Sequence, residues 1–213
     1  YEVDYNLELA EKIGADITDK QIDIFVSHND KAFADKFIKE NNIKRRILGM
    51  APGGGSNPGQ EMSIKRWPIE KYTKLIENIS KEYDIILFGG AGDKDVNKEI
   101  RDKLSKSSYI NVFDAAGKTT LQQAAALIKK CDLFVTHDSG LMHIAAAAKV
   151  NVIALFGPTP ALRFAPKDAV VIQSKQAGCP CYDIYGNYVI CASKNCMNDI
   201  SVDEVYAKIN KLK

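Results

Sequence analysis

An α/β fold built on one parallel sheet is predicted by two features of the sequence. Between about residues 45 and 174, short apolar runs alternate with stretches whose apolar residues recur at helical spacing. Glycine-rich turns also follow several of the apolar runs, as expected where parallel strands end at one edge of a sheet and lead into helices. We therefore expect a Rossmann-like sheet with helices packed against it.

The clearest part of this pattern lies between residues 131 and 158. An apolar run at 133–135 ends in the polar sequence THDSG, small residues at 144–148 suit a helix packed close to a sheet, and residues 150–156 return as a strand. A helix that begins at this turn directs unpaired N–H groups and partial positive charge toward the strand ends. The sequence therefore predicts an anion-binding site at this turn.

Four residues of this turn carry the predicted chemistry. Ser139 and Gly140 would supply backbone donors to an anion, Asp138 would accept hydrogen bonds from hydroxyl groups, and His143 would face the same site from the first turn of the helix. The alternative is that Asp138 and Ser139 only cap a helix and that His143 is an ordinary helix histidine.

Composition excludes several classes of protein. The 213 residues include 29 Lys or Arg and 27 Asp or Glu, and the formal charge of +2 argues against a broad nucleic-acid surface. No apolar run approaches the length of a transmembrane segment, and no signal peptide is visible. Because the chain begins with Tyr1 rather than Met, we expect a fragment or a processed product.

The alternation of strands and helices places a domain boundary near residue 44. Residues 1–44 are expected to be a remnant of another domain or a linker, and residues 45–213 to form the main domain. The expected strands are at 22–26, 46–51, 84–88, 110–113, 133–135, 150–156 and 170–174, and the expected helices at 7–13, 30–40, 96–104, 121–129 and 201–212.

Two glycine-rich turns of the main domain also point to a ligand. The turn PGGGSNPG at 52–59 frees the backbone to wrap an oxyanion, although its spacing is neither that of a Walker loop nor that of the dinucleotide fingerprint. Lys65 and Arg66 follow it as candidate phosphate ligands, with solvated surface cations as the alternative. Asp93, after the turn GGAG at 89–92, is a candidate for ribose hydroxyls, and capping of the next helix explains it equally well. The backbone near Thr119 is available to a nucleobase edge.

Four cysteines gather late in the chain, at Cys179, Cys181, Cys191 and Cys196. Because no secretion signal is visible, we expect reduced thiols in preference to disulfides. Their spacing is not that of a common zinc motif, so structural zinc at these positions is the less favoured alternative.

The set of motifs, taken in chain order, resembles glycosyltransferase family 9, the ADP-heptose:lipopolysaccharide heptosyltransferases. The resemblance covers the chain from about residue 45 to its end. It rests on PGGGS (52–56), KRWP (65–68), LFGG (87–90), GKTTL (117–121), HDSGLMH (137–143) and FGPT (156–159).

The resemblance implies a GT-B enzyme, in which two Rossmann-like domains face each other across a cleft, and this chain matches the C-terminal, donor-binding half. It implies that Lys65 binds phosphate, that Gly54, Gly55 and Ser56 form the loop beside it, and that Thr119 lies near the nucleobase. Asp138, Ser139, Gly140 and His143 would contact the diphosphate and the sugar. For the acidic ribose ligand, Gly92 and Asp93 compete for the same position in the motif.

The implied reaction is inverting transfer of heptose from ADP-heptose to a lipopolysaccharide inner-core acceptor, with no required metal or other cofactor. The general base would be an aspartate of the acceptor domain, so no catalytic residue is expected here and the chain is expected to be inactive alone. The resemblance also implies a cytoplasmic protein that acts at the inner face of the membrane on a lipid-linked acceptor. A GT-B enzyme or epimerase that uses a UDP-sugar, and a non-catalytic module that binds nucleotide sugars, remain alternatives.

Overall fold

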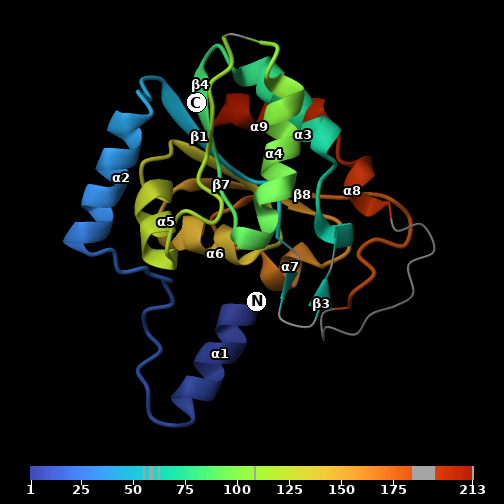
Figure 1. The fold of residues 1–213 in the computed structure, drawn as a ribbon. Coiled ribbons are helices and arrows are strands. Elements are labelled where there is room, and N and C mark those ends of the chain that lie inside the picture. The colour runs from blue at the N-terminus through green and yellow to red at the C-terminus, as the bar shows by residue number, and fades with distance from the viewer. Residues whose placement is uncertain (55, 58–59, 62, 108, 184–194, 213) are drawn as a thin grey trace.

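The structure is a computed structural model that describes residues 1–54, 56–57, 60–61, 63–107, 109–183 and 195–212 (Figure 1). Over these residues the main sheet has six strands, all parallel, in the order β5-β4-β1-β6-β7-β8. The strands are β1 (Arg46–Ala51), β4 (Tyr83–Leu87), β5 (Val112–Asp114), β6 (Leu133–His137), β7 (Asn151–Phe156) and β8 (Val170–Gln173). This confirms the predicted Rossmann-like parallel sheet.

The order of the strands creates a switch point between β1 and β6. From β1 the chain moves outward to β4 and β5, and it then returns to the other side of β1 to form β6, β7 and β8. The two neighbouring loops at the carboxyl ends of β1 and β6 therefore lead to opposite sides of the sheet. In open α/β sheets, ligands bind in the crevice that opens at such a point.

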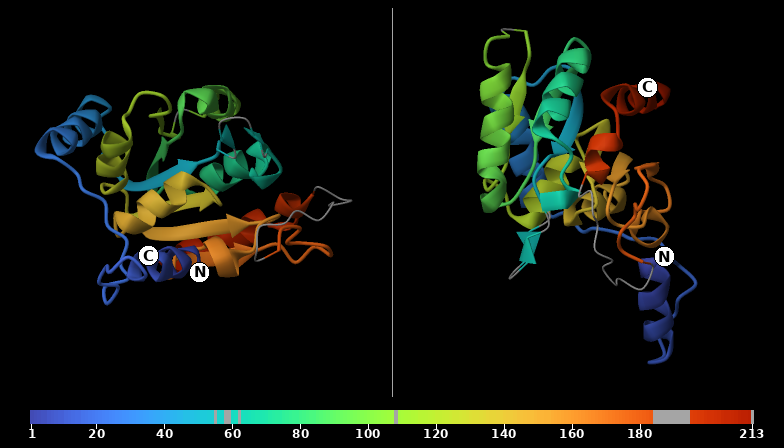
Figure 2. Two further views of the ribbon diagram at one scale, coloured as in Figure 1. Left: turned by 90° about the horizontal axis from the view of Figure 1, so that it is seen from below. Right: turned by 90° about the vertical axis from the view of Figure 1, so that its right-hand side faces the viewer.

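Helices cover both faces of the sheet (Figure 2). One hydrophobic cluster contains residues of α3 (Ile69–Ile79), α4 (Lys94–Leu104) and α9 (Val202–Lys211). The other contains residues of α2 (His28–Glu40), α5 (Leu121–Ile128) and α6 (Gly140–Ala147). Strand residues alternate between the two clusters, as Ile47 and Leu48 of β1 do, because successive side chains of a strand point to opposite faces.

Side-chain caps fix the starts of several helices. Ser27 and Asp30 form a capping box at α2, and Thr120 forms one with Gln123 at α5. Ser201 accepts a hydrogen bond from the backbone N–H of Glu204 at α9. The last two caps confirm the starts that the sequence predicted for these helices.

The N-terminal segment differs in part from the prediction. Residues 22–26 form no strand, although all of them are described; they run as a loop whose Ile22 carbonyl accepts a hydrogen bond from Lys149 Nζ. The apolar pattern of these residues reflects instead the burial of Val26, which joins Ala34 of α2 and Ile43 in the cluster around α5 and α6.

Helix α1 (Glu2–Glu11) begins five residues earlier than predicted and lies away from the sheet in Figure 1. None of its residues is buried, and Tyr5 and Leu9 are exposed. It is tied to the main domain by an ion pair between Glu2 and Arg163, whose nearest atoms are 2.7 Å apart.

Several short elements were not predicted. They are β2 (Ser56–Asn57) and β3 (Gln60–Glu61), which form a small antiparallel pair, the 3-10 helices η1 (Ser63–Lys65) and η2 (Ala91–Asp93), and the one-turn helices α7 (Ala161–Phe164) and α8 (Cys196–Asp199). Elements of two to four residues are too short to show a hydrophobic period.

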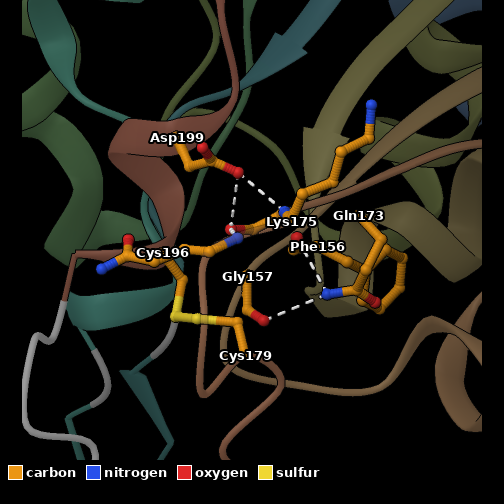
Figure 3. The surroundings of a disulfide bond; sticks show 9 residues. Phe156, Gly157, Gln173, Lys175, Cys179, Cys196 and Asp199 are labelled. Atoms are coloured by element: carbon orange, nitrogen blue, oxygen red, sulfur yellow. Dashed lines mark hydrogen bonds between the residues drawn. A yellow bond between two sulfur atoms is a disulfide. The ribbon is translucent and has the colours of Figure 1, made fainter.

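The expectation of reduced thiols is wrong for two of the late cysteines, because Cys179 and Cys196 form a disulfide (Figure 3). The bond ties the start of α8 to the segment after β8. The same region is held by Asp199, whose carboxylate accepts hydrogen bonds from the backbone N–H of Lys175 and from Ser174 Oγ. Cys181 is buried beside the disulfide, and Cys191 lies outside the described residues.

Reduction of this disulfide is expected to destabilise the fold. The bond joins residues 17 apart in sequence, and closing a loop of that size contributes up to about 3 kcal/mol through the entropy of the unfolded chain. Urea unfolding with and without a reductant measures the difference. Peptide mapping that finds Cys179 and Cys196 alkylated before reduction, with equal unfolding midpoints in both conditions, would contradict the pairing.

Candidate functional site

A cavity of about 510 Å³ opens at the carboxyl ends of β1, β4 and β6, across the switch point. Its wall combines glycine-rich backbone, charged side chains and an apolar surface. The lining residues are Ala51, Gly53, Gly54, Lys65, Phe88, Gly89, Gly90, Asp93, Thr119, Thr120, Leu121, Ala124, Asp138, Ser139, Gly140, Leu141, His143 and Ile144.

The register of the sheet explains why these residues meet. Ala51 at the end of β1 lies opposite Thr136 of β6, so the turn that follows β1 and the turn that follows β6 are adjacent. On the other side, Met50 lies opposite Leu87 at the end of β4, which brings the turn at 88–93 to the same edge.

Helix α6 begins at the floor of the cavity. Ser139 occupies its N-cap position, but among the described residues its side chain caps no backbone N–H; Ser139 Oγ lies 3.2 Å from Thr136 Oγ1 instead. The alternative that Ser139 serves only as a side-chain cap is therefore wrong. Ser139, Gly140 and Leu141 all line the cavity, so the positive end of the helix dipole faces it.

Lys65 and Asp138 form an ion pair in the wall of the cavity, with Lys65 Nζ 2.7 Å from Asp138 Oδ2. Both side chains are largely shielded from solvent, with relative exposures of 18% and 11%. Thr159 Oγ1, from the turn after β7, donates a second hydrogen bond of 2.8 Å to the same carboxylate oxygen. The ammonium group is therefore held at the cavity wall by a carboxylate that is itself held in place.

Thr159 was not among the predicted site residues. It is buried, with a relative exposure of 3%, and it orients Asp138 without lining the cavity. Its place in the FGPT sequence after β7 was a signal that sequence reasoning noted without giving Thr159 a role. The other lining residues that were missed, such as Phe88 and Leu141, extend the apolar wall.

The turn after β1 is fixed by hydrogen bonds at Gly54, which has a positive φ of 88°. Its backbone N–H donates to Asp93 Oδ1 over 2.8 Å, and its carbonyl accepts from Arg66 Nε over 2.8 Å. Arg66 therefore supports the turn, and it does not line the cavity as a phosphate ligand would. Asp93 Oδ2 also accepts from the backbone N–H of Gly90 over 2.8 Å, which caps η2. The predicted capping of the next helix is wrong, because Asp93 occupies the N-cap position of α4 without a side-chain hydrogen bond to that helix.

Two histidines lie at this end of β6 and α6. His137 is fully buried, and its Nε2 atom lies 3.4 Å from the Pro52 carbonyl at the start of the turn after β1. Burial lowers the pKa of His137, and hydrogen bonding to the backbone opposes that effect. His143 lines the cavity; burial lowers its pKa, while the carboxylates of Asp138 and Glu2 act in the opposite direction. In both cases burial therefore favours the neutral form of the ring.

The structure gathers most of the predicted residues at one place. Those that line the cavity are Gly54, Lys65, Asp93, Thr119, Asp138, Ser139, Gly140 and His143. Gly55 lies outside the described residues, and Ser56 belongs to β2. Gly92, which competed with Asp93, is exposed and does not line the cavity.

Over the described ranges the structure contains neither a cluster of metal ligands nor a helix that could cross a membrane. There, no group of three or more His, Cys, Asp and Glu side chains has an arrangement that could hold a metal ion. Within the same ranges, none of the helices combines the length and the apolar character that a membrane crossing requires.

Comparison with known proteins identifies the family. The model of glycosyltransferase family 9 (heptosyltransferase) matches residues 2–184, which is most of the chain. The chain belongs to this family. The fold, a Rossmann-like sheet with a cavity at its switch point, is that of a GT-B glycosyltransferase domain.

Several relatives of this family 9 chain are lipooligosaccharide or lipopolysaccharide heptosyltransferases. Lipooligosaccharide heptosyltransferase 2 of Haemophilus influenzae is 44% identical over 127 residues, covering 58% of this chain and 35% of that protein. The protein of the same name from Campylobacter jejuni is 32% identical over 186 residues, covering 84% of this chain and 55% of that protein.

A solved structure agrees with these sequence relatives. The ADP-heptose lipopolysaccharide heptosyltransferase II of Escherichia coli aligns with a TM-score of 0.68 at 28% identity, over 89% of this chain and 53% of that chain. The chain thus spans between about a third and a little over half of the proteins that it matches.

His143 is expected to titrate below its ordinary pKa of 6.5, and Glu2→Gln should lower that pKa further because it removes a carboxylate that favours the charged ring. An NMR titration of the imidazole signals measures both values. An unchanged or raised His143 pKa in Glu2→Gln would contradict the proximity of α1 to the cavity.

The same shift predicts how stability depends on pH. Since the unfolded chain binds a proton at higher pH than folded His143 does, stability should fall as the pH drops below about 6.5. His143→Gln should make this loss shallower in urea unfolding series. His28→Gln, which removes an exposed imidazole from α2, controls for the substitution itself.

Proposed function

We propose that this chain is the donor-binding half of an inverting heptosyltransferase, which transfers heptose from ADP-heptose to a lipopolysaccharide inner-core acceptor. The observation that carries the proposal is the cavity at the switch point. It joins the start of α6 and the ammonium group of Lys65 to an apolar wall, a combination that suits a nucleotide diphosphate.

In this proposal the diphosphate lies between Lys65 and the backbone N–H groups of Ser139 and Gly140. Asp138, which holds Lys65 in the absence of ligand, would accept hydrogen bonds from donor hydroxyls once the ammonium group turns to phosphate. Gly54, Gly55 and Ser56 would form the loop over the phosphates. His143, in the first turn of α6, could contact the sugar.

The adenosine would lie along the wall formed by Phe88, Thr119, Leu121 and Ala124. This surface is largely apolar, which suits stacking of a purine, and the backbone at Thr119 offers hydrogen bonds to its edge. Leu121 is 59% exposed and lines the cavity, so a bound ligand would cover part of it.

Catalysis by these residues would be electrostatic. When the bond between the anomeric carbon and the β-phosphate oxygen breaks, negative charge grows on the departing ADP. Lys65 and the N-terminus of α6 would bind that growing charge more tightly than they bind the intact donor, and this difference lowers the barrier. The His143 ring can donate a hydrogen bond to the same region.

The acceptor side of the reaction lies outside the proposed donor site. We propose that residues 45–213 form the donor domain and that residues 1–44 link it to an acceptor domain or are a remnant of one. The general base that removes the proton from the acceptor hydroxyl would belong to that domain, so this chain alone would bind the donor without transferring the sugar. A lipid-linked acceptor further implies that the whole protein works in the cytoplasm at the inner face of the membrane.

Calorimetric titration of this chain with ADP, ADP-heptose and UDP tests the proposal. We expect ADP and ADP-heptose to bind and UDP to bind at least tenfold more weakly. Lys65→Met should weaken ADP binding by 10- to 100-fold, because a charged hydrogen bond contributes about 1.5–3 kcal/mol. Asp138→Ala should weaken the binding of ADP-heptose more than the binding of ADP.

Lys74→Met is the matched control, since it removes the same charge from an exposed position on α3, away from the cavity. Selective binding of UDP would move the chain to a branch that uses UDP-sugars. A folded sample that binds none of the three nucleotides would contradict the donor site.

A further inference from the structure

Asp93 makes contacts that a ribose ligand does not need. Its two carboxylate oxygens accept hydrogen bonds from two different turns, Oδ1 from the N–H of Gly54 and Oδ2 from the N–H of Gly90, each over 2.8 Å. The Gly54 turn follows β1 and the Gly90 turn follows β4. One side chain therefore joins the two glycine-rich turns that form one side of the cavity.

The glycines around this carboxylate leave room for it. A Cβ atom added to Gly53 would collide with the Asp93 carboxyl group, and one added to Gly89 would lie 2.7 Å from Asp93 Cβ. Both turns thus approach Asp93 so closely that any other residue at these two positions would force the Asp93 side chain or the turn to shift. The glycines of the turns serve contact with Asp93 as well as contact with a ligand.

The contact continues from Gly54 to the turn after β6. Gly54 packs so close to that turn that an added Cβ would lie 3.3 Å from the His137 ring and 3.4 Å from Ser139 Cβ. Its carbonyl is fixed by Arg66, the residue that follows Lys65. A shift of the Gly54 turn would therefore displace the neighbours of both Lys65 and the α6 N-terminus.

We propose that Asp93 is a positioning residue for the diphosphate part of the site. Its carboxylate lies between the two turns and accepts hydrogen bonds from the N–H groups of Gly54 and Gly90, which would otherwise lack an acceptor. In this way it holds the Gly54 turn against Ser139. This inference rests on the proposed function, because it assigns a role within the donor site.

The two roles predict different results for a ligand that has no ribose. Asp93→Asn keeps the size of the side chain, but its NH₂ group cannot accept a hydrogen bond from a backbone N–H. If Asp93 positions the diphosphate site, Asp93→Asn should weaken ADP and inorganic pyrophosphate by the same factor, about tenfold. If Asp93 serves only as a ribose ligand, ADP binding alone should weaken.

The direction of the change in affinity distinguishes a positioning role from an effect of the Asp93 charge alone. Removing a negative charge near an anion site should strengthen anion binding by Coulomb's law, so a weakening cannot arise from the charge alone. Asp95→Asn removes the same charge two residues away, at an exposed position on α4, and should leave both affinities unchanged or slightly tighter.

The experiment combines titrations with hydrogen exchange of the free protein. Wild type, Asp93→Asn, Asp95→Asn and Gly53→Ala are titrated with ADP and with pyrophosphate, and backbone amide exchange is followed by NMR without ligand. We expect equal losses for both ligands in Asp93→Asn and in Gly53→Ala, and faster exchange at Gly54 and Gly90 in Asp93→Asn, with exchange in β1 unchanged.

Loss of ADP binding with pyrophosphate binding intact, an equal loss in Asp95→Asn, or unchanged exchange at both glycine amides would each overturn the proposal. If the wild type binds neither ligand, the donor site itself fails. The exchange rates, which require no ligand, then still decide whether Asp93 holds the two turns.

Discussion

The parallel pairing of β1 with β6 is the constraint on which the rest of the site depends. It places the end of β1 beside the end of β6, with Ala51 opposite Thr136, although the two strands are more than 80 residues apart in sequence. The chain reverses direction across the sheet at this pair, so the turns that follow the two strands diverge and leave a crevice. Lys65 and Asp138 face each other because they follow these two strands.

Polar contacts between turns then convert the crevice into a defined site. Asp138 is held by Lys65 and Thr159, and Thr159 comes from the turn after β7. The turn after β7 is itself fixed by the Pro158 carbonyl, which accepts hydrogen bonds from the backbone N–H groups of Cys181 and Tyr182. The disulfide-bonded segment thus supports the site from a distance, through the backbone next to Thr159.

The fold could be predicted from the sequence because its signals are local. β1 was predicted with the bounds that it has, since an apolar run of five residues between Arg46 and the glycine-rich turn has one simple interpretation. The start of α5 was equally clear from Thr120, whose cap lies within three residues of it. Asp138 and Gly140 were predicted because they lie at the end of a strand and the start of a helix, and Lys65 because it follows a glycine-rich turn.

The contacts that define the site could not be predicted in this way, because they join distant parts of the chain. Asp93 contacts Gly54, 39 residues away, and a local pattern shows only its capping bond to Gly90. Cysteine spacing likewise does not reveal that Cys179 pairs with Cys196, and the absence of a secretion signal pointed to the opposite result.

A crystal structure of this chain with ADP tests the central claim most directly. We expect the diphosphate between Lys65 Nζ and the N–H groups at the start of α6, with the adenine along Leu121 and Ala124. A second cavity of about 600 Å³, at the amino end of β7, is lined by Lys20, Lys149 and Lys167 among others. Nucleotide bound there, with the cavity at the switch point empty, would contradict the account.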